Sequence, residues 1–310
     1  MNPSFSIRMH YLLRSLLLSG LAVYIMHLNH TDALKYYLAP HMQLLLLCCP
    51  VPLLFIALGL GIHAAAGRAG ELCDCGHALP DTLIKKIFVY GLFVLPLLLG
   101  TLLPDKSLGS EMAARKGMSY SLPGQEIRRK EKADSSQALR QEATMENEQE
   151  TVLRSLDERF MPPDEYNTEF AELAKRMYLQ PKIIVHEKIF SETIGALDLY
   201  KHEFEGKPIS ITGFVYRDKE MGNGMIFAIG RFLVMCCPAD ATPFGIMVEA
   251  EHAPKLAKDS WVKVEGILRV ATDEDVERLE IRAAKITPAV EPESPYIYTQ
   301  ADALSIFDRL

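Results

Sequence analysis

Hydrophobic residues are concentrated in the first third of the chain. Three apolar stretches lie there, at 11–28, 42–66 and 87–103, whereas acidic and basic residues recur every few positions from residue 105 onward. A helix needs about 20 apolar residues to cross a hydrocarbon core of about 30 Å. The pattern therefore predicts a membrane domain over residues 1–104 with three transmembrane helices.

The first apolar stretch has a second interpretation. Its basic start, at Arg8 and Arg14, and its apolar centre are also typical of a cleaved signal peptide. No small-residue cleavage motif precedes His27, however, and two more apolar stretches follow. A retained membrane helix is the favoured interpretation, because Arg14 lies near one end and can extend its guanidinium to the headgroups.

Basic residues beside the apolar stretches indicate an orientation. The loop 29–41 carries only Lys35, whereas the other side carries Arg8, Arg14, Arg68, Lys85 and Lys86. Because basic residues favour the cytoplasmic side, we expect a multi-pass membrane protein with its C-terminal domain outside the cytoplasm. Arg115, Lys116 and the basic run 128–130 fall on the opposite side and count against this orientation.

Three further segments follow the membrane domain. Residues 105–147 are predicted to form a flexible linker, because the part from Ser119 onward has almost no large apolar residues. Residues 148–180 place apolar residues at helical spacing and predict short helices. Residues 181–310 show short apolar runs separated by turn residues, which is typical of a β-rich domain.

The β-rich segment contains five main strand candidates, at 208–216, 225–235, 244–250, 261–270 and 278–286. With a helical segment around 252–258, this order predicts an OB-like five-stranded barrel. Gly213, Gly230 and Gly266 would supply the bends that closure needs. The expected fold class is thus a membrane α-helical N-terminal part followed by an α+β or all-β C-terminal domain.

Charge argues against the ligand that such barrels often bind. The chain has a formal net charge of −7, and the excess of acidic residues lies mainly in the segment after residue 181. Nucleic-acid binding depends on a basic surface that neutralises phosphates. We therefore expect no nucleic acid among the partners.

The six cysteines occur as three close pairs. They are Cys48-Cys49, Cys73-x-Cys75 and Cys236-Cys237. None has the two-residue spacing of a zinc ribbon or a thioredoxin-type motif, and adjacent cysteines pair with each other only through a strained ring. At Cys48-Cys49, next to Pro50 and Pro52, either a bend exposes the thiols to a substrate path or, as we favour, the cysteines pack as small apolar residues.

The strongest candidate site is the segment 231–240. Consecutive strand residues point to opposite faces, so Cys236 and Cys237 meet one ligand only if the strand ends there. Pro238 provides that ending, and Asp240 can then fold back toward the thiols. Cys236, Cys237 and Asp240 are therefore a candidate metal site for a zinc or copper-like ion. The alternatives are a redox-sensitive thiol pair, or one core cysteine with an incidental neighbour.

A weaker candidate lies between the second and third apolar stretches. Cys73, Cys75 and His77 lie within five positions, and thiol and imidazole groups suit zinc or copper(I). A short polar turn of reduced thiols is the alternative.

Several segments together resemble a bacterial family of proposed permease subunits, the YcgQ-like proteins. The matching segments are 34–40, 104–117, 206–217, Arg231-Phe232, Cys236-Cys237-x-Ala239-Asp240, Trp261-Val262 and 295–298. The resemblance covers most of the chain. It implies an accessory subunit in the bacterial inner membrane, with a separate multi-span permease of the ArsP-like type that carries the transport path.

These observations favour a transport accessory whose soluble domain binds a metal or thiophilic ion. The sequence offers no separate general base, nucleotide loop or cofactor motif, so we do not expect an enzyme. Two other interpretations stay open: a membrane-anchored thiol redox or metal-handling protein, and a structural anchor that presents a protein-binding barrel.

Overall fold

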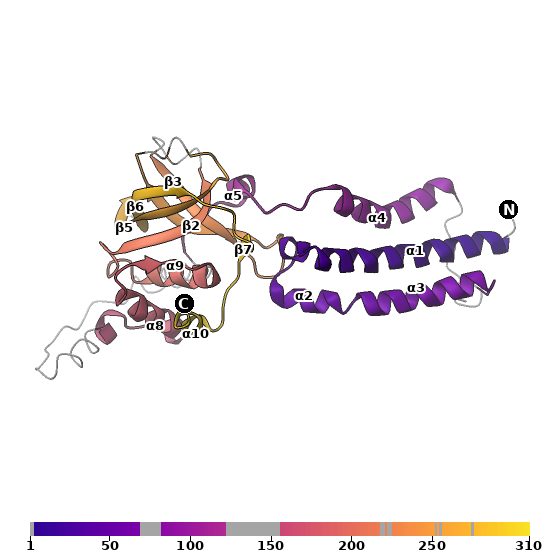
Figure 1. The fold of residues 1–310 in the computed structure, drawn as a ribbon, viewed down its shortest axis with the longest axis horizontal. Helices are drawn as coiled ribbons and strands as arrows, with labels where there is room; N and C mark the ends of the chain where they lie inside the picture. The colour runs from indigo at the N-terminus through magenta and orange to yellow at the C-terminus, as the bar shows by residue number, and fades with distance from the viewer. Residues whose placement is uncertain are drawn as a thin grey trace, which may run out of the picture. The chain divides into compact units, whose positions relative to one another are not determined.

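The computed structural model describes residues 3–68, 82–121, 156–217, 221, 225–251, 253, 256–273 and 276–310. Figure 1 shows its helices and strands. The chain divides into two compact units, residues 1–106 and 107–310, and each is described by itself. The predicted site residues Cys73, Cys75 and His77 lie outside the described residues.

The first unit is helical. Its elements are α1 (Pro3–His30), η1 (Ala33–Tyr36), α2 (Pro40–Leu47), α3 (Pro50–Ala65) and α4 (Leu83–Leu102). Three segments, 7–30, 40–65 and 83–102, are long and apolar enough to cross a membrane. The three apolar stretches of the sequence are thus confirmed as helices of a membrane-associated protein.

The second apolar segment is interrupted at its cysteine pair. Cys48 and Cys49 separate α2 from α3, and Pro50 begins α3 because a proline at the first helical position loses no helical hydrogen bond. Both cysteines are exposed within this unit. The favoured interpretation, that they pack as small residues at a helix contact, is therefore wrong within the described residues.

Polar contacts join the helices of the first unit. His10 Nδ1 of α1 lies 2.7 Å from the Tyr90 hydroxyl of α4. The Ser15 hydroxyl of α1 donates to the carbonyl of Ala57 in α3 at 2.7 Å. Such bonds between apolar helices contribute about 0.6–2 kcal/mol each.

The second unit contains a sheet and short helices. The helices are α5 (Ser110–Lys116), η3 (Glu165–Asn167), α8 (Thr168–Tyr178), η4 (Glu187–Ile189), α9 (Phe190–Leu199) and α10 (Ala303–Phe307). The strands are β1 (Ile183–Ile184), β2 (Pro208–Tyr216), β3 (Ile226–Leu233), β4 (Thr242–Glu249), β5 (Trp261–Asp273), β6 (Val276–Pro288) and β7 (Tyr296–Ile297). Each of the five predicted strands corresponds to one of β2 to β6.

The seven strands form one sheet in the order β1-β2-β5-β6-β4-β3-β7. An additional pairing joins β2 to β3, so β2, β5, β6, β4 and β3 form a closed cycle. Within this cycle the β4–β6 pairing is parallel and the others are antiparallel. The β-rich C-terminal domain is thus confirmed.

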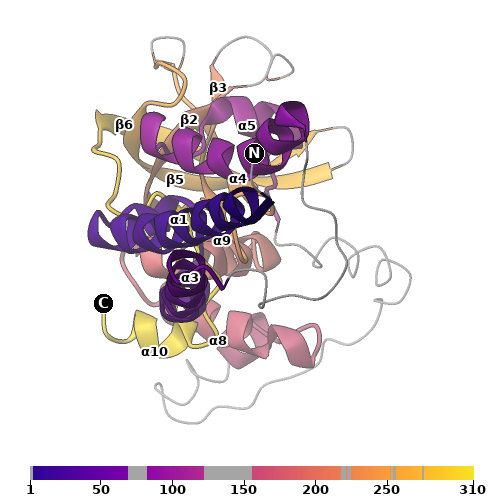
Figure 2. The same cartoon turned by 90° about the vertical axis from the view of Figure 1, so that its right-hand side faces the viewer.

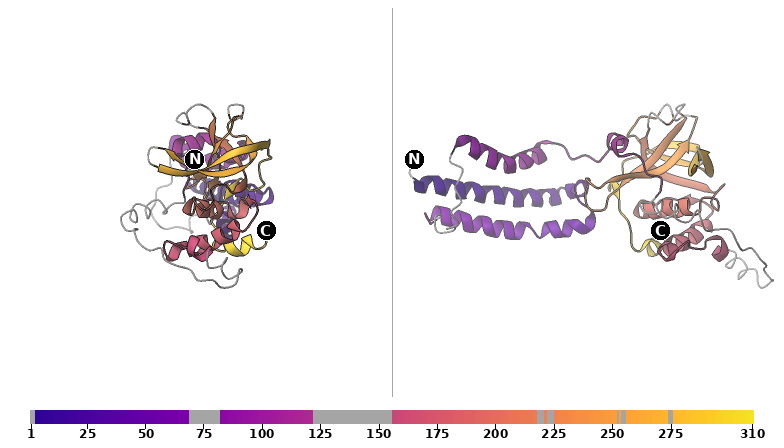
Figure 3. Two further views of the ribbon diagram at one scale, coloured as in Figure 1. Left: turned by 90° about the vertical axis from the view of Figure 1, so that its left-hand side faces the viewer. Right: turned by 180° about the vertical axis from the view of Figure 1, so that it is seen from behind.

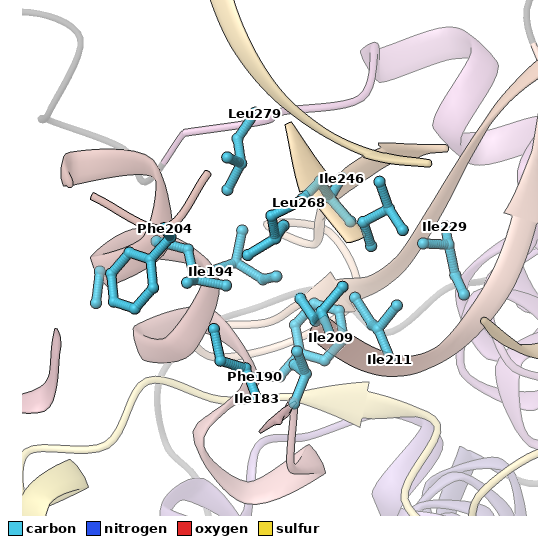
Figure 4. Packing of buried hydrophobic residues seen from close by; sticks show 14 of the residues in the cluster. Ile183, Phe190, Ile194, Phe204, Ile209, Ile211, Ile229, Ile246, Leu268 and Leu279 are labelled. Atoms are coloured by element: carbon cyan, nitrogen blue, oxygen red, sulfur yellow. The ribbon is translucent and has the colours of Figure 1, made fainter. Parts of the chain in front are cut away.

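The core of the second unit lies between the sheet and the helices. Every residue of α9 from Phe190 to Asp198 is buried, and Figures 1 and 3 show α9 between the sheet and α8. Figure 4 shows Phe190 and Ile194 packed among strand residues such as Ile209 and Leu268. Helix α10 lies beside α8 (Figure 2), where Arg176 forms an ion pair with Asp308.

The predicted linker over 105–147 is ordered in its first part. Residues 107–121 belong to the second unit, and α5 buries Ala113 against Phe232 and Ala241. The linker prediction is wrong for residues 107–118, because the low apolar content begins only at Ser119 and apolar residues before it, such as Met112 and Ala113, pack in a core. Residues 122–155 lie outside the described residues. So do positions 252, 254 and 255, where a helical segment stays a prediction.

Glycines permit close approach of neighbouring strands. A Cβ atom added at Gly213 of β2 would lie 2.5 Å from the carbonyl oxygen of Gly230 in β3. In β5, the register with β6 shifts between Glu265 and Gly266, which marks a bulge. The predicted bulge is therefore observed at Gly266, whereas Gly213 and Gly230 instead permit neighbouring strands to approach closely.

We expect Gly213→Ala to destabilise the second unit by about 1–3 kcal/mol, because the added methyl overpacks the β2–β3 contact. Trp261, the single tryptophan of the chain, lies in β5, so its fluorescence in a denaturant titration reports unfolding of this unit. Ile267→Ala is the control, since that β5 side chain is 49% exposed. Equal midpoints for Gly213→Ala and wild type would contradict the prediction.

Candidate metal site

The candidate site is the turn that joins β3 to β4, residues 234–241. Strand β3 ends at Leu233, and the N–H of Val234 donates to the carbonyl of Ile297 at 3.0 Å. The chain then reverses, with the N–H of Asp240 donating to the carbonyl of Cys237 at 3.1 Å. The predicted end of the strand before Pro238 is thus confirmed.

The Asp240 carboxylate holds this turn together. It accepts backbone N–H groups from Met235 at 2.9 Å, Cys236 at 2.7 Å and Cys237 at 3.4 Å. Burial opposes its ionisation, but these bonds and the contact with the Cys236 thiol outweigh that effect and lower the pKa of Asp240. A charged carboxylate therefore sets the backbone around both cysteines.

The two thiols lie side by side on the turn. The Sγ atoms of Cys236 and Cys237 are 3.5 Å apart. Cys236 is exposed and Cys237 is half-buried. A donor atom of each of these residues and of Asp240 lies within 4.8 Å of the others. The structure therefore brings together the three residues that the sequence placed in one candidate site.

The electrostatics of the turn keep the Cys236 thiol protonated. The Asp240 carboxylate and then the neighbouring Cys237 raise the pKa of the Cys236 thiol to about 12. A thiol is nucleophilic only as the thiolate, so this environment disfavours redox exchange at neutral pH. A bound metal cation reverses that balance, because it deprotonates a coordinating thiol.

The geometry suits a single thiophilic ion. Two Zn–S bonds of about 2.3 Å allow sulfur atoms at most about 4.6 Å apart, and the observed separation is 3.5 Å. The Asp240 carboxylate, although it already accepts N–H groups, is the third potential donor. Three protein donors on an exposed turn leave a coordination position open, as in sites that exchange ligands.

The other motif side chains, those of Arg231, Phe232 and Trp261, lie on strands β3 and β5. Arg231 is 2% exposed and donates to the carbonyl of Ser294 at 3.2 Å. Its guanidinium lies 5.3 Å from the centre of the Trp261 ring. Phe232 stacks on Phe214 with ring centres 5.2 Å apart. These side chains pack on the strands next to the turn and contribute no donor atom to the cluster.

One functional contact was missed by the sequence analysis. The Lys116 ammonium of α5 donates to the carbonyls of Ala239 at 2.8 Å and Ala241 at 2.7 Å, on either side of Asp240. Ala239 thus contributes its carbonyl, not its side chain. In the sequence, Lys116 stands out only as a basic residue near a membrane helix. Its place within the matching segment 104–117 was the signal that could have found it.

The comparisons with known proteins agree with this architecture. Residues 13–119 match the DUF1980 N-terminal domain, and residues 160–299 match the DUF1980 C-terminal domain. The chain therefore has the organisation of a DUF1980 protein, with apolar membrane helices in its N-terminal domain followed by a separate C-terminal domain. The chain belongs to the YcgQ-like family.

The chain is similar to a curated relative and, over a short part, to a solved structure. The chain is 22% identical over 217 residues to UPF0703 protein YcgQ of Bacillus subtilis (strain 168), which covers 69% of each chain. A small single-stranded DNA-binding protein from Streptomyces coelicolor matches 28% of this chain and 96% of its own, with 18% identity and a TM-score of 0.18. A TM-score this low supports no statement about fold or ligand.

We expect Asp240→Asn to lower the pKa of Cys236 toward its ordinary value, because the substitution removes the negative charge that opposes the thiolate. Alkylation of Cys236 between about pH 7 and about pH 9 should then become roughly tenfold faster, measured by mass spectrometry. Cys48 and Cys49 serve as internal controls, since they lie in the other unit. An unchanged rate at Cys236 would show that Asp240 does not control this thiol.

Proposed function

We propose that this protein is an accessory subunit of a bacterial membrane transport system whose soluble domain binds a thiophilic metal ion at Cys236 and Cys237. The observation that carries this proposal is the pair of thiols 3.5 Å apart on an exposed turn that Asp240 organises. The membrane helices anchor this domain, and the site acts on an ion near the membrane surface.

The protonation state of Cys236 favours ion binding over thiol redox chemistry. A thiol whose pKa is raised to about 12 attacks a disulfide slowly at neutral pH. An incoming cation displaces the proton instead, so that binding releases protons and strengthens as pH rises. This supports a binding subunit and not an enzyme.

The strand pairing supports the OB-like barrel predicted for the soluble domain. Counted along the chain from β2 to β6, the first strand, β2, pairs with the second and fourth strands, β3 and β5, and the third strand, β4, pairs in parallel with the fifth, β6. A five-stranded Greek-key barrel has this kind of connectivity. In the proposal, the thiol turn lies between the second and third strands of that barrel.

The membrane helices favour a separate subunit for the transport path. The groove among α1, α2, α3 and α4 has a volume of about 920 Å³ and is lined mainly by leucine, isoleucine, proline and tyrosine residues, with Cys49 as the one thiol. No charged side chain lines this groove within the described residues. Ions cross membranes along polar pathways, so we assign the path to a multi-span permease that this protein accompanies.

The localisation follows from the same proposal. The distribution of basic residues around the apolar segments supports a multi-pass protein of the bacterial inner membrane with an extracytoplasmic soluble domain. There, the thiol turn would meet an ion before or after its passage through the permease.

Metal binding tests the site. The full chain in detergent, titrated with Zn²⁺ or Cu⁺ against a competing chelator, should bind one ion with high affinity at the turn. The Cys236→Ser/Cys237→Ser variant should lose that ion. The matched control is Cys48→Ser/Cys49→Ser, the other adjacent pair, which should bind as wild type does. A third variant, Cys73→Ser/Cys75→Ser/His77→Ala, separates any ion held in the loop outside the described residues. Identical binding by wild type and the Cys236/Cys237 variant would contradict the proposal.

A second experiment tests the role in transport. The full chain purified from native membranes should bring with it a multi-span membrane protein, and deletion should reduce ion transport in cells. The Cys236→Ser/Cys237→Ser variant should retain the partner and lose transport. Full transport by this variant would instead favour a structural anchor that binds another protein.

A further inference from the structure

Helix α5 contacts the thiol turn through its last residue. The Lys116 ammonium donates to two carbonyls of the turn, those of Ala239 and Ala241, at 2.8 and 2.7 Å. These two residues flank Asp240, whose carboxylate holds the N–H groups of the cysteines. The turn is therefore held from both sides, by Asp240 from within and by Lys116 from α5.

The chain after α5 strengthens this contact. Gly117 ends the helix with φ of +80°, a backbone conformation that residues with a side chain rarely adopt. The chain then runs beside β4, where the N–H of Ser119 donates to the carbonyl of Pro243 at 2.8 Å and its carbonyl accepts from Gly245 at 3.1 Å. Helix α5 is thereby joined to the strand that begins directly after the turn.

The other end of α5 is fixed by a distant residue. The Asp259 carboxylate accepts both the hydroxyl of Ser110, at 3.0 Å, and its backbone N–H. A Cβ atom at Gly109 would lie 2.8 Å from a carboxylate oxygen of Asp259, so a side chain at this position would displace that carboxylate. Asp259 itself has φ of +63°. Both ends of this short helix therefore have specific polar partners.

Apolar packing connects the same elements. Ala113 of α5 is fully buried in a cluster with Phe232 and Val234, at the end of β3 and just beyond it, and Ala241 of the turn. Helix α5 and the turn thus share one small core, separate from the main core around α9.

We propose that Lys116 is a positioning residue for the thiol turn, and that α5 and the turn open and close together in one cooperative step. Helix α4 ends at Leu102 and α5 begins at Ser110, so residues 103–109 connect α4 directly to α5 along the chain. The state of the thiols and the stability of α5 are then energetically linked. For the ligand, this inference rests on the proposed function; the hold of Lys116 on the turn stands independently of it.

Amide hydrogen exchange of the full chain in detergent tests the hold. Lys116→Met keeps the aliphatic stem and removes both hydrogen bonds, and we expect exchange at the amides of 235–237 to become about tenfold faster. Arg115→Met is the matched control, because Arg115 is on the same helix, has a side chain that is 74% exposed and forms an ion pair with Glu111 of that helix at 3.2 Å. Equal exchange in Lys116→Met and wild type would overturn the role of Lys116.

A substitution at the far end of α5 tests whether the two elements open together. Asp259→Asn weakens the contact with Ser110, and asparagine tolerates the positive φ at this position. We expect exchange to rise in α5 and also at the amides of 235–237. An increase in exchange confined to α5 would show that the turn opens separately and would overturn the proposal that the two elements open together.

Added Zn²⁺ tests the link to the ligand. Because linkage is reciprocal, Zn²⁺ bound at the turn should slow exchange in α5 in wild type and leave it unchanged in Cys236→Ser/Cys237→Ser. If Zn²⁺ binds at the turn but exchange in α5 does not change, the link is wrong. If wild type binds no Zn²⁺, the proposed function and its ligand linkage both fail, whereas the Lys116→Met and Asp259→Asn results still decide how the turn is held.

Discussion

Strand β2 pairs along both of its edges, and most features of the second unit depend on this arrangement. It pairs with β5 from Pro208 to Phe214, and with β3 from Phe214 to Tyr216. Phe214 takes part in both pairings, so its ring meets Phe232 of β3 on one side and Trp261 of β5 on the other. Without the β2–β3 contact, the strand that leads into the thiol turn would lose its support, because Arg231 would no longer contact Trp261 of β5 and Phe232 would no longer stack on Phe214 of β2.

Asp240 has two effects on the same turn. Its carboxylate satisfies backbone N–H groups that would otherwise need water, and its charge keeps Cys236 protonated. The first effect fixes where the two sulfur atoms lie, and the second keeps the Cys236 thiol unreactive in the absence of a cation. If the turn binds a metal ion as proposed, it discriminates between an oxidant, which needs a thiolate, and a metal ion, which generates one.

The sequence predicted the helices and strands well because their signals are local. Long apolar runs predict α1, α3 and α4, and short apolar runs bounded by turn residues predict β2 and β3. The cysteine pair was also visible, since Cys236, Cys237 and Asp240 lie within five positions. Lys116 was not, because its carbonyl partners lie more than 120 residues away along the chain. Helix α5 is too short to have a periodic pattern, and only the fold shows what it contacts.

The order of the strands has a further consequence for a domain attached to a membrane. The strands at the two ends of the sheet order, β1 and β7, have two residues each in the structure as described. Proteins confined to a membrane surface meet one another often, and long unpaired strand edges invite sheets to join. Because the remaining strands pair in a cycle, neighbouring copies of this domain find little edge on which to extend a sheet. Crowding on the membrane should therefore not lead to aggregation through the sheet.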